Sequence, residues 1–183
     1  MSRPNSRLTE EQRLIELARI ADRRAEVEEF VNILEGRVNT LKQISQKLQD
    51  LGDEVYTYHF LEFQRVVSEN LAFIIIIEGR LATQPQGEKD ELLEKFDDLI
   101  AAIWSIVLTG SLSFLTTISN DEYLPLGSRE VFVHELRSLN DARIKLTDER
   151  FKSRLNKSTL IQVDKAERIL SEVIEKAPKL LLF

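Results

Sequence analysis

Two residues of this chain have types and a spacing that could perform chemistry together. Arg129 and His134 are separated by four residues, at the expected start of a helix that follows a loop with Pro125. A guanidinium can hold a phosphate group while an imidazole moves a proton near neutral pH. On an ideal helix the two side chains point about 140° apart, but Arg129 is long and stands at the frayed start. The pair therefore suggests phosphodiester cleavage as one hypothesis.

The surrounding stretch resembles a known family signature. Arg129-Glu-Val-Phe-Val-His134 resembles the Arg-x4-6-His motif of the HEPN superfamily, whose helical bundles include metal-independent ribonucleases. In the toxin branch the motif runs Arg-x4-His-x-Tyr, and here Leu136 stands in place of the Tyr. The resemblance implies a ribonuclease or toxin with Arg129 and His134 as its catalytic residues.

Other catalytic and metal-binding classes lack the residues that they need. The chain has no Cys and two His, which excludes disulfides, thiolate zinc sites and cysteine nucleophiles. It contains no Gly-rich phosphate loop, no G-x-S-x-G elbow and no His-Glu-x-x-His helix. A carboxylate di-metal bundle would need Glu-x-x-His pairs, and the sequence holds none. We therefore expect neither a metal nor a cofactor.

The charge of the chain is acidic overall and unevenly distributed. The net charge is −6, and residues 53–125 hold 13 acids against 4 bases. An acidic chain is a poor general ligand for phosphate backbones. The local exception is the stretch Arg143–Lys157, with six basic and two acidic residues. We expect any nucleic-acid contact to be confined to that stretch.

The elements that must position these residues begin with one long helix over residues 8–51. Thr9–Gln12 has the form of a capping box, and Gly52 supplies a stop. Apolar residues recur at alternating spacings of three and four, which is the pattern of a coiled-coil seam. The apolar seam residues are Leu17, Ile20, Val27, Val31, Leu34, Val38, Leu41 and Leu48. We expect the seam to pair helices, with a homodimer or another protein as the partner.

Two further helices are expected in the middle of the chain. Residues 53–82 return antiparallel to the first helix, so that 8–82 form a long hairpin. Residues 88–118 form a third helix, in which Leu99–Ile118 has no charged residue and could span a bilayer by length. That stretch contains six Ser or Thr and has acidic rather than basic flanks. We expect a buried central helix, with membrane insertion as the alternative.

The rest of the chain predicts a C-terminal hairpin over residues 129–177. Its two helices cover about 129–151 and about 159–177, and the second should end at Ala177 because Pro178 follows. In the first of them Phe132, Leu136, Leu139 and Leu146 are expected to point inward. Residues 1–183 are then a single all-α domain, an elongated antiparallel helical bundle.

The sequence thus favours a non-enzymatic helical interaction or scaffold protein. The seam and the charged outer faces of its helices suit helix–helix association. The N-terminus has no secretory signal, so the cytoplasm is the expected compartment and a soluble protein the expected state. The HEPN-like ribonuclease or toxin is the first alternative, and a membrane-inserting protein that uses Leu99–Ile118 is the second.

Overall fold

The computed structural model describes residues 10–49, 53–83, 91–120 and 128–180, and within these ranges the chain is helical almost throughout. The six helices are α1 (Glu10–Gln49), α2 (Asp53–Leu81), α3 (Glu91–Asn120), α4 (Ser128–Thr147), α5 (Glu149–Lys152) and α6 (Lys157–Leu180). No strand occurs in the described ranges. The all-α class predicted from the 3–4 periodicity is confirmed.

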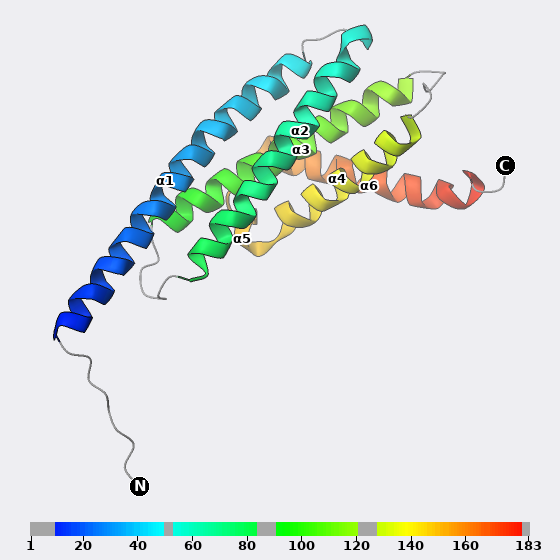
Figure 1. Ribbon diagram of the computed structural model, residues 1–183. Coiled ribbons are helices and arrows are strands. Elements are labelled where there is room, and N and C mark those ends of the chain that lie inside the picture. Colours follow the sequence, from blue (N-terminus) through cyan, green and yellow to red (C-terminus); the bar gives the residue numbers. More distant parts are fainter. Residues whose placement is uncertain (1–9, 50–52, 84–90, 121–127, 181–183) are drawn as a thin grey trace.

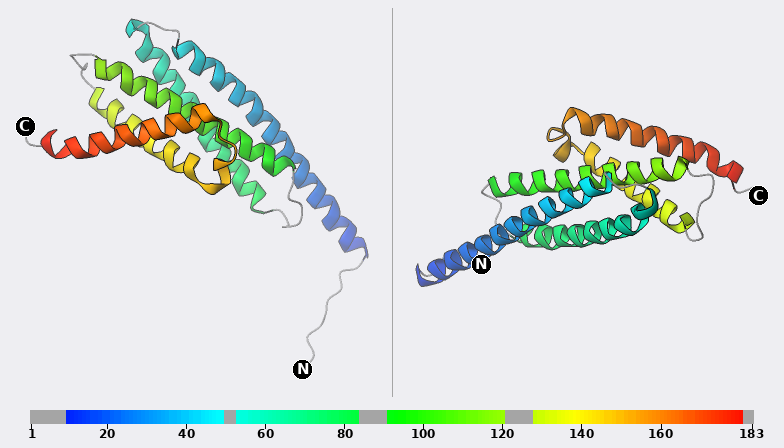
Figure 2. Two further views of the ribbon diagram at one scale, coloured as in Figure 1. Left: turned by 180° about the vertical axis from the view of Figure 1, so that it is seen from behind. Right: turned by 90° about the horizontal axis from the view of Figure 1, so that it is seen from above.

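The helices form a bundle in which successive long helices reverse direction. Figure 1 shows α1, α2 and α3 side by side in an up-down-up order, with α4 returning along α3. The short α5 closes the end of α4, and α6 then crosses over α3 and α4. The views in Figure 2 place α6 on the side of α3 that faces away from α2.

The centre of the bundle is α3, which contacts every other helix. Its buried apolar residues are Phe96, Ile100, Ala101, Ile103, Val107, Leu108, Leu112, Phe114 and Leu115. The span Glu91–Thr116 passes a length and composition test for crossing a membrane, with a mean hydropathy of 1.9, but 56% of its most apolar window is buried inside the bundle. Core helices of soluble bundles pass the same test. The expected central position of this helix is therefore found.

Most of the seam of α1 is core within this one chain. Val27, Val31, Leu34, Val38, Leu41 and Leu48 are all buried, because α2 and α3 cover this face of α1. Leu17 is 62% exposed and Ile20 is half-buried, since they lie before the first point where α1 meets the bundle. Only the N-terminal end of the predicted seam is left for a partner.

Beyond shifts of one or two residues elsewhere in the described ranges, two boundaries of the C-terminal hairpin differ from the prediction. The expected single helix 129–151 is wrong, because the Asp148 side chain accepts a hydrogen bond from the Arg150 backbone N–H at 2.9 Å and starts α5 as a separate turn. The expected end at Ala177 is also wrong, because α6 continues to Leu180. A proline in a helix lacks a backbone donor and crowds the carbonyl four residues before it, and α6 nevertheless continues for two residues past Pro178. The capping box at Thr9 and the stop at Gly52 lie outside the described residues.

Candidate functional site

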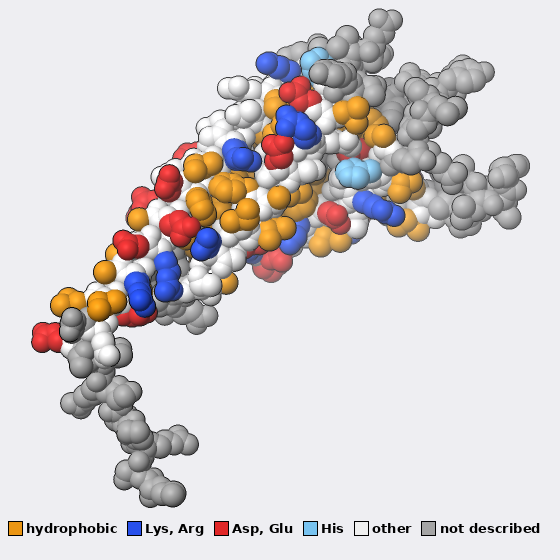
Figure 3. Space-filling model, viewed as in Figure 1, with side chains coloured by type: hydrophobic (Ala, Val, Ile, Leu, Met, Phe, Trp, Pro, Cys, Tyr) orange, Lys and Arg blue, Asp and Glu red, His pale blue; other side chains and the backbone are white. Residues whose placement is uncertain are grey.

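A cavity of about 200 Å³ lies between α2 and α4, with α3 as its floor. Both walls pack on α3, whereas within the described ranges the backbones of α2 and α4 stay apart and the two helices meet through side chains. Figure 3, seen from the side of α2, shows apolar side chains gathered on this face, with charged side chains around them. The lining residues are Phe63, Gln64, Val67, Ser68, Leu71, Trp104, Val107, Ser111, His134, Glu135, Ser138 and Asp141.

The most deeply buried charged group of the described lining is the carboxylate of Glu135, which is 2% exposed. Its Oε2 accepts a hydrogen bond from the Ser111 hydroxyl of α3 at 2.7 Å. Its Oε1 accepts one from the Gln64 side-chain amide of α2 at 2.5 Å. One acid of α4 is thus bonded to both other helices of the cavity. A buried carboxylate is tolerated only with such partners.

The imidazole of His134 forms the third contact of this carboxylate. Its Nδ1 lies 3.1 Å from Oε1 of Glu135, and the contact is an ion pair when the imidazole is protonated. The His134 side chain is 62% exposed, so one edge of the ring faces solvent. A carboxylate on one imidazole nitrogen fixes the orientation of the ring, as general bases require. The side chain of Arg129 lies outside the described residues.

Glu135 is the site residue that sequence reasoning missed. The buried residues of α4 are Glu135, Leu139, Ala142 and Leu146, at spacings of four, three and four. Two residues expected to point inward, Phe132 and Leu136, are half-buried instead. Continuing the apolar series backward from Leu139 would have placed Glu135 on the core face. A charged residue at such a position is a strong indication of a polar site, because Glu is almost never fully buried without partners.

The cavity is electrostatically an acidic site. Glu135 and Asp141 contribute carboxylates to its lining, and among the described lining residues His134 is the one that can carry positive charge. Two bases of α4, Arg137 and Lys145, are exposed and do not line it. Phosphate groups are therefore poorly served by the described part of this cavity, whereas cations are favoured.

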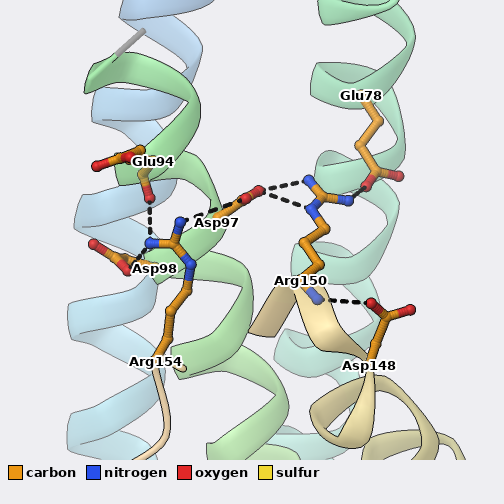
Figure 4. A network of polar contacts seen from close by, with 7 residues as sticks. All are labelled: Glu78, Glu94, Asp97, Asp98, Asp148, Arg150 and Arg154. Carbon is orange, nitrogen blue, oxygen red and sulfur yellow. Dashed lines mark hydrogen bonds and ion pairs between the residues drawn. The ribbon is translucent and has the colours of Figure 1, made fainter. Parts of the chain in front are cut away.

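The basic stretch Arg143–Lys157 is largely engaged in ion pairs with the bundle itself. Figure 4 shows Arg150 and Arg154 of the α5 region reaching Asp97 of α3 from two sides. Arg150 donates to Oδ1 of Asp97 at 3.0 and 2.6 Å and lies 3.3 Å from Glu78. Burial acts to lower the pKa of Arg150, but the hydrogen bonds and charges of Asp97 and Glu78 outweigh it and raise that pKa. These contacts fasten α5 to α2 and α3.

Other cations of the stretch are neutralised in the same way. Arg154 pairs with Asp98 and donates to the Glu94 carbonyl at 3.2 Å. Arg143 lies 3.9 Å from Glu167, and Lys152 lies 3.2 Å from an acid of its own turn. With Arg150, four of the six basic residues have a carboxylate within 4.0 Å. The positive electrostatic field that this stretch offers to a phosphate backbone is correspondingly small.

The second candidate region is the free N-terminal end of α1. This helix has 40 residues and α2 has 29, so at 1.5 Å per residue α1 is about 16 Å longer. Figure 1 shows its first turns extending beyond the other helices. Among the side chains described from Glu10 to Arg23, all are exposed except the half-buried Ile20. The ion pair of Glu26 with Arg80 at 3.4 Å marks where α1 joins the bundle.

Comparisons with family models, with curated proteins and with solved structures find no match to this chain.

Proposed function

We propose that the chain is a non-enzymatic interaction protein that self-associates through the projecting end of α1. One observation carries the proposal, namely that this end exposes an apolar stripe that none of the described helices covers. Leu14 is 64% exposed and Leu17 is 62% exposed. The stripe consists of Leu14, Leu17, Ala18, Ala21 and Ala25, which share one helix face and are all exposed. Exposed leucines at helical spacing on a free helix are typical of a helix-pairing surface.

The charges of the same segment favour a second copy of the chain as the partner. Residues 10–16 hold three acids and one base, whereas residues 17–24 hold three bases and one acid. Two copies that pair antiparallel place the acidic half of each segment against the basic half of the other. Parallel pairing would place like charges together. The segment is therefore self-complementary about a two-fold axis, as an isologous dimer requires.

The size of this surface favours a reversible dimer. Stable interfaces bury roughly 1,200–2,000 Å² in total, and two helix ends of about four turns offer less than that. The complementary charges then determine the relative orientation of the two copies more than they increase the affinity of the dimer. We expect a dissociation constant in the micromolar range, of about 10 μM, that weakens as added salt screens the charges.

A charge exchange tests the proposal. The variant Glu10→Lys/Glu16→Lys makes both halves of the segment basic, and Arg19→Glu/Arg23→Glu makes both halves acidic. Each variant alone should be monomeric in sedimentation equilibrium, because it repels its own copy. An equimolar mixture of the two should recover the dimer mass. Two variants that stay dimeric alone, or a mixture that stays monomeric, would contradict the proposal.

A second pair of variants separates the apolar contribution from folding. Leu17→Gln should weaken the dimer about tenfold or more and leave the helical circular dichroism signal unchanged. The matched control is Ile161→Gln on α6, an equally exposed residue at 68% that lies outside the segment. It should leave the dimer intact. A wild-type mass of one chain at the highest attainable concentration would also overturn the proposal.

The two alternatives from the sequence receive less support. A ribonuclease needs a basic subsite beside His134, and the described lining of that cavity is acidic. Membrane insertion would have to remove α3 from its contacts with all five other helices. The interaction function requires neither a basic subsite beside His134 nor the removal of α3 from the bundle.

A further inference from the structure

We propose that the cavity between α2 and α4 is a binding site for a small organic cation, specifically a protonated amine with an apolar body. This site is separate from the α1 surface and would operate in monomer and dimer alike. The site is supported by the shape of the cavity, by the apolar and acidic groups of its lining and by the partners of its buried carboxylate.

The described lining contains an apolar group and an acidic group of residues, and Gln64, Ser68 and Ser111 are further polar members. Phe63, Val67 and Leu71 of α2 and Trp104 and Val107 of α3 present hydrocarbon and aromatic surface. The residues contributed by α4 are all polar, and two of them are the acids Glu135 and Asp141. An amphiphilic amine matches this division, because its hydrocarbon body is buried while its ammonium meets carboxylates. The half-buried ring of Trp104 adds a face that attracts cations.

The partners of Glu135 leave one position that a ligand can take. Ser111, which is 1% exposed, approaches from inside the bundle, and the half-buried Gln64 approaches from the α2 wall. His134 is the outer partner, and its imidazole is mostly in solvent. An ammonium entering from the open side can therefore displace the imidazole and donate to the same oxygen. The inner partners remain in place and keep the carboxylate oriented.

The volume limits the size of the amine. Sites for drug-sized ligands measure about 300–1,000 Å³, and this cavity measures about 200 Å³. It therefore suits a body of about one ring. A ligand with so few atoms binds with a dissociation constant of about 1 mM or somewhat tighter.

The experiment uses Trp104, the one tryptophan of the chain, as its reporter. The full chain is titrated with benzylamine, and the tryptophan emission is followed. Benzyl alcohol has nearly the same shape without the charge and serves as the control ligand. We expect a saturable change with benzylamine that benzyl alcohol does not produce. Equal responses to both, or no saturable change with benzylamine up to about 10 mM, would overturn the proposal.

Two variants then locate the ammonium. Asp141→Asn removes an exposed charge from the lining, cannot unsettle the core and should weaken benzylamine binding about three- to tenfold. Asp164→Asn, an exposed acid of α6 outside the lining, should not change it. Glu135→Gln should abolish the response while the helical signal is retained. If that variant unfolds, the comparison of Asp141→Asn with Asp164→Asn decides alone, and equal affinities in the two would overturn the site.

Discussion

The ring of Phe63 on α2 occupies the space in which any residue larger than glycine at Gly110 of α3 would place its side chain. A Cβ at Gly110 would lie 2.6 Å from two carbons of that ring, and Phe63 is 2% exposed. The two helices approach closely here because one has no side chain at the contact. This contact also forms part of the wall of the cavity, because Phe63 lines it.

Gly110→Ala should therefore destabilise the protein despite the better helix propensity of alanine. The propensity gain is about 1 kcal/mol, whereas overpacking a buried ring costs about 1–3 kcal/mol. We expect a net loss of about 1 kcal/mol in the free energy of unfolding, measured by urea denaturation. Gly36→Ala on α1 is the matched control, because no neighbouring atom lies within 4 Å of the added Cβ. It should gain about 0.5–1 kcal/mol, and a similar gain at Gly110 would refute the packing argument.

Arg150→Gln should loosen α5 from the rest of the bundle. It leaves the carboxylate of Asp97, 7% exposed as a residue, with only the weaker contact to Arg154 at 3.7 Å. Breaking a fully buried pair costs about 3–5 kcal/mol, but Arg150 is 39% exposed and solvent screens it. We expect a loss of about 1–2 kcal/mol. Lys152→Gln, which breaks an exposed pair with Glu149, should stay within about 0.5 kcal/mol.

The pH dependence of this effect follows from the sign of the pKa shift. The folded state raises the pKa of Arg150, so the folded chain holds that proton more tightly than the unfolded chain. The stabilisation is fully present below the unfolded pKa of arginine and is lost only as the pH rises through the still higher pKa of the folded state. The stability difference between wild type and Arg150→Gln should therefore be the same at pH 7 and pH 9. A stability difference that shrinks between pH 7 and pH 9 would contradict the assignment of this stabilisation to the charge of Arg150.

The parts of the fold that the sequence predicts well are those that local periodicity determines. The helical spacing around Ile74–Ile77 outweighs the strand preference of four β-branched residues, and α2 is helical there with Ile74 and Ile77 buried. The uncharged run in α3 predicts its central position, because only the middle of a bundle can bury a helix on most of its faces. Both inferences need no knowledge of which segments meet.

The parts that the sequence does not predict depend on how distant segments meet. Arg150 and Asp97 are 53 positions apart, and their pairing follows from the register in which α5 docks on α3. The seam of α1 has the same pattern whether its partner belongs to the same chain or to another. The burial of Val27 through Leu48 by α2 and α3 is thus a tertiary fact. The spacing of the apolar residues of α4 was sufficient to predict that Glu135 is buried. The apolar neighbour Leu136 was assigned to the core face in its place.

Glu135→Leu should be destabilising because it leaves buried donors without an acceptor. The hydroxyl of Ser111 loses its 2.7 Å hydrogen bond, and an unpaired buried donor costs about 1–3 kcal/mol. Ser111→Ala alone should cost about 1 kcal/mol. In the double variant the two costs should not add, and a coupling of about 0.5–2 kcal/mol is expected. Strict additivity in urea denaturation would show that the Ser111–Glu135 bond does not stabilise the fold.

The last prediction separates the interaction protein from the HEPN-like ribonuclease. We expect the purified chain not to cleave RNA in the absence of added metal, because the described acids that line the cavity beside His134, Glu135 and Asp141, repel phosphate. His134→Ala should then change the free energy of unfolding by no more than about 0.5 kcal/mol, as exposed residues usually do. The same variant and Arg129→Ala should both retain the dimer.

Metal-independent cleavage that each single variant abolishes, with the helical signal intact, would instead establish the catalytic pair and displace the interaction function as the primary one. Cleavage that survives both variants would point to a contaminating nuclease. The HEPN-like reaction needs the guanidinium to hold the phosphate and the imidazole to move the proton, so it could not proceed in either variant.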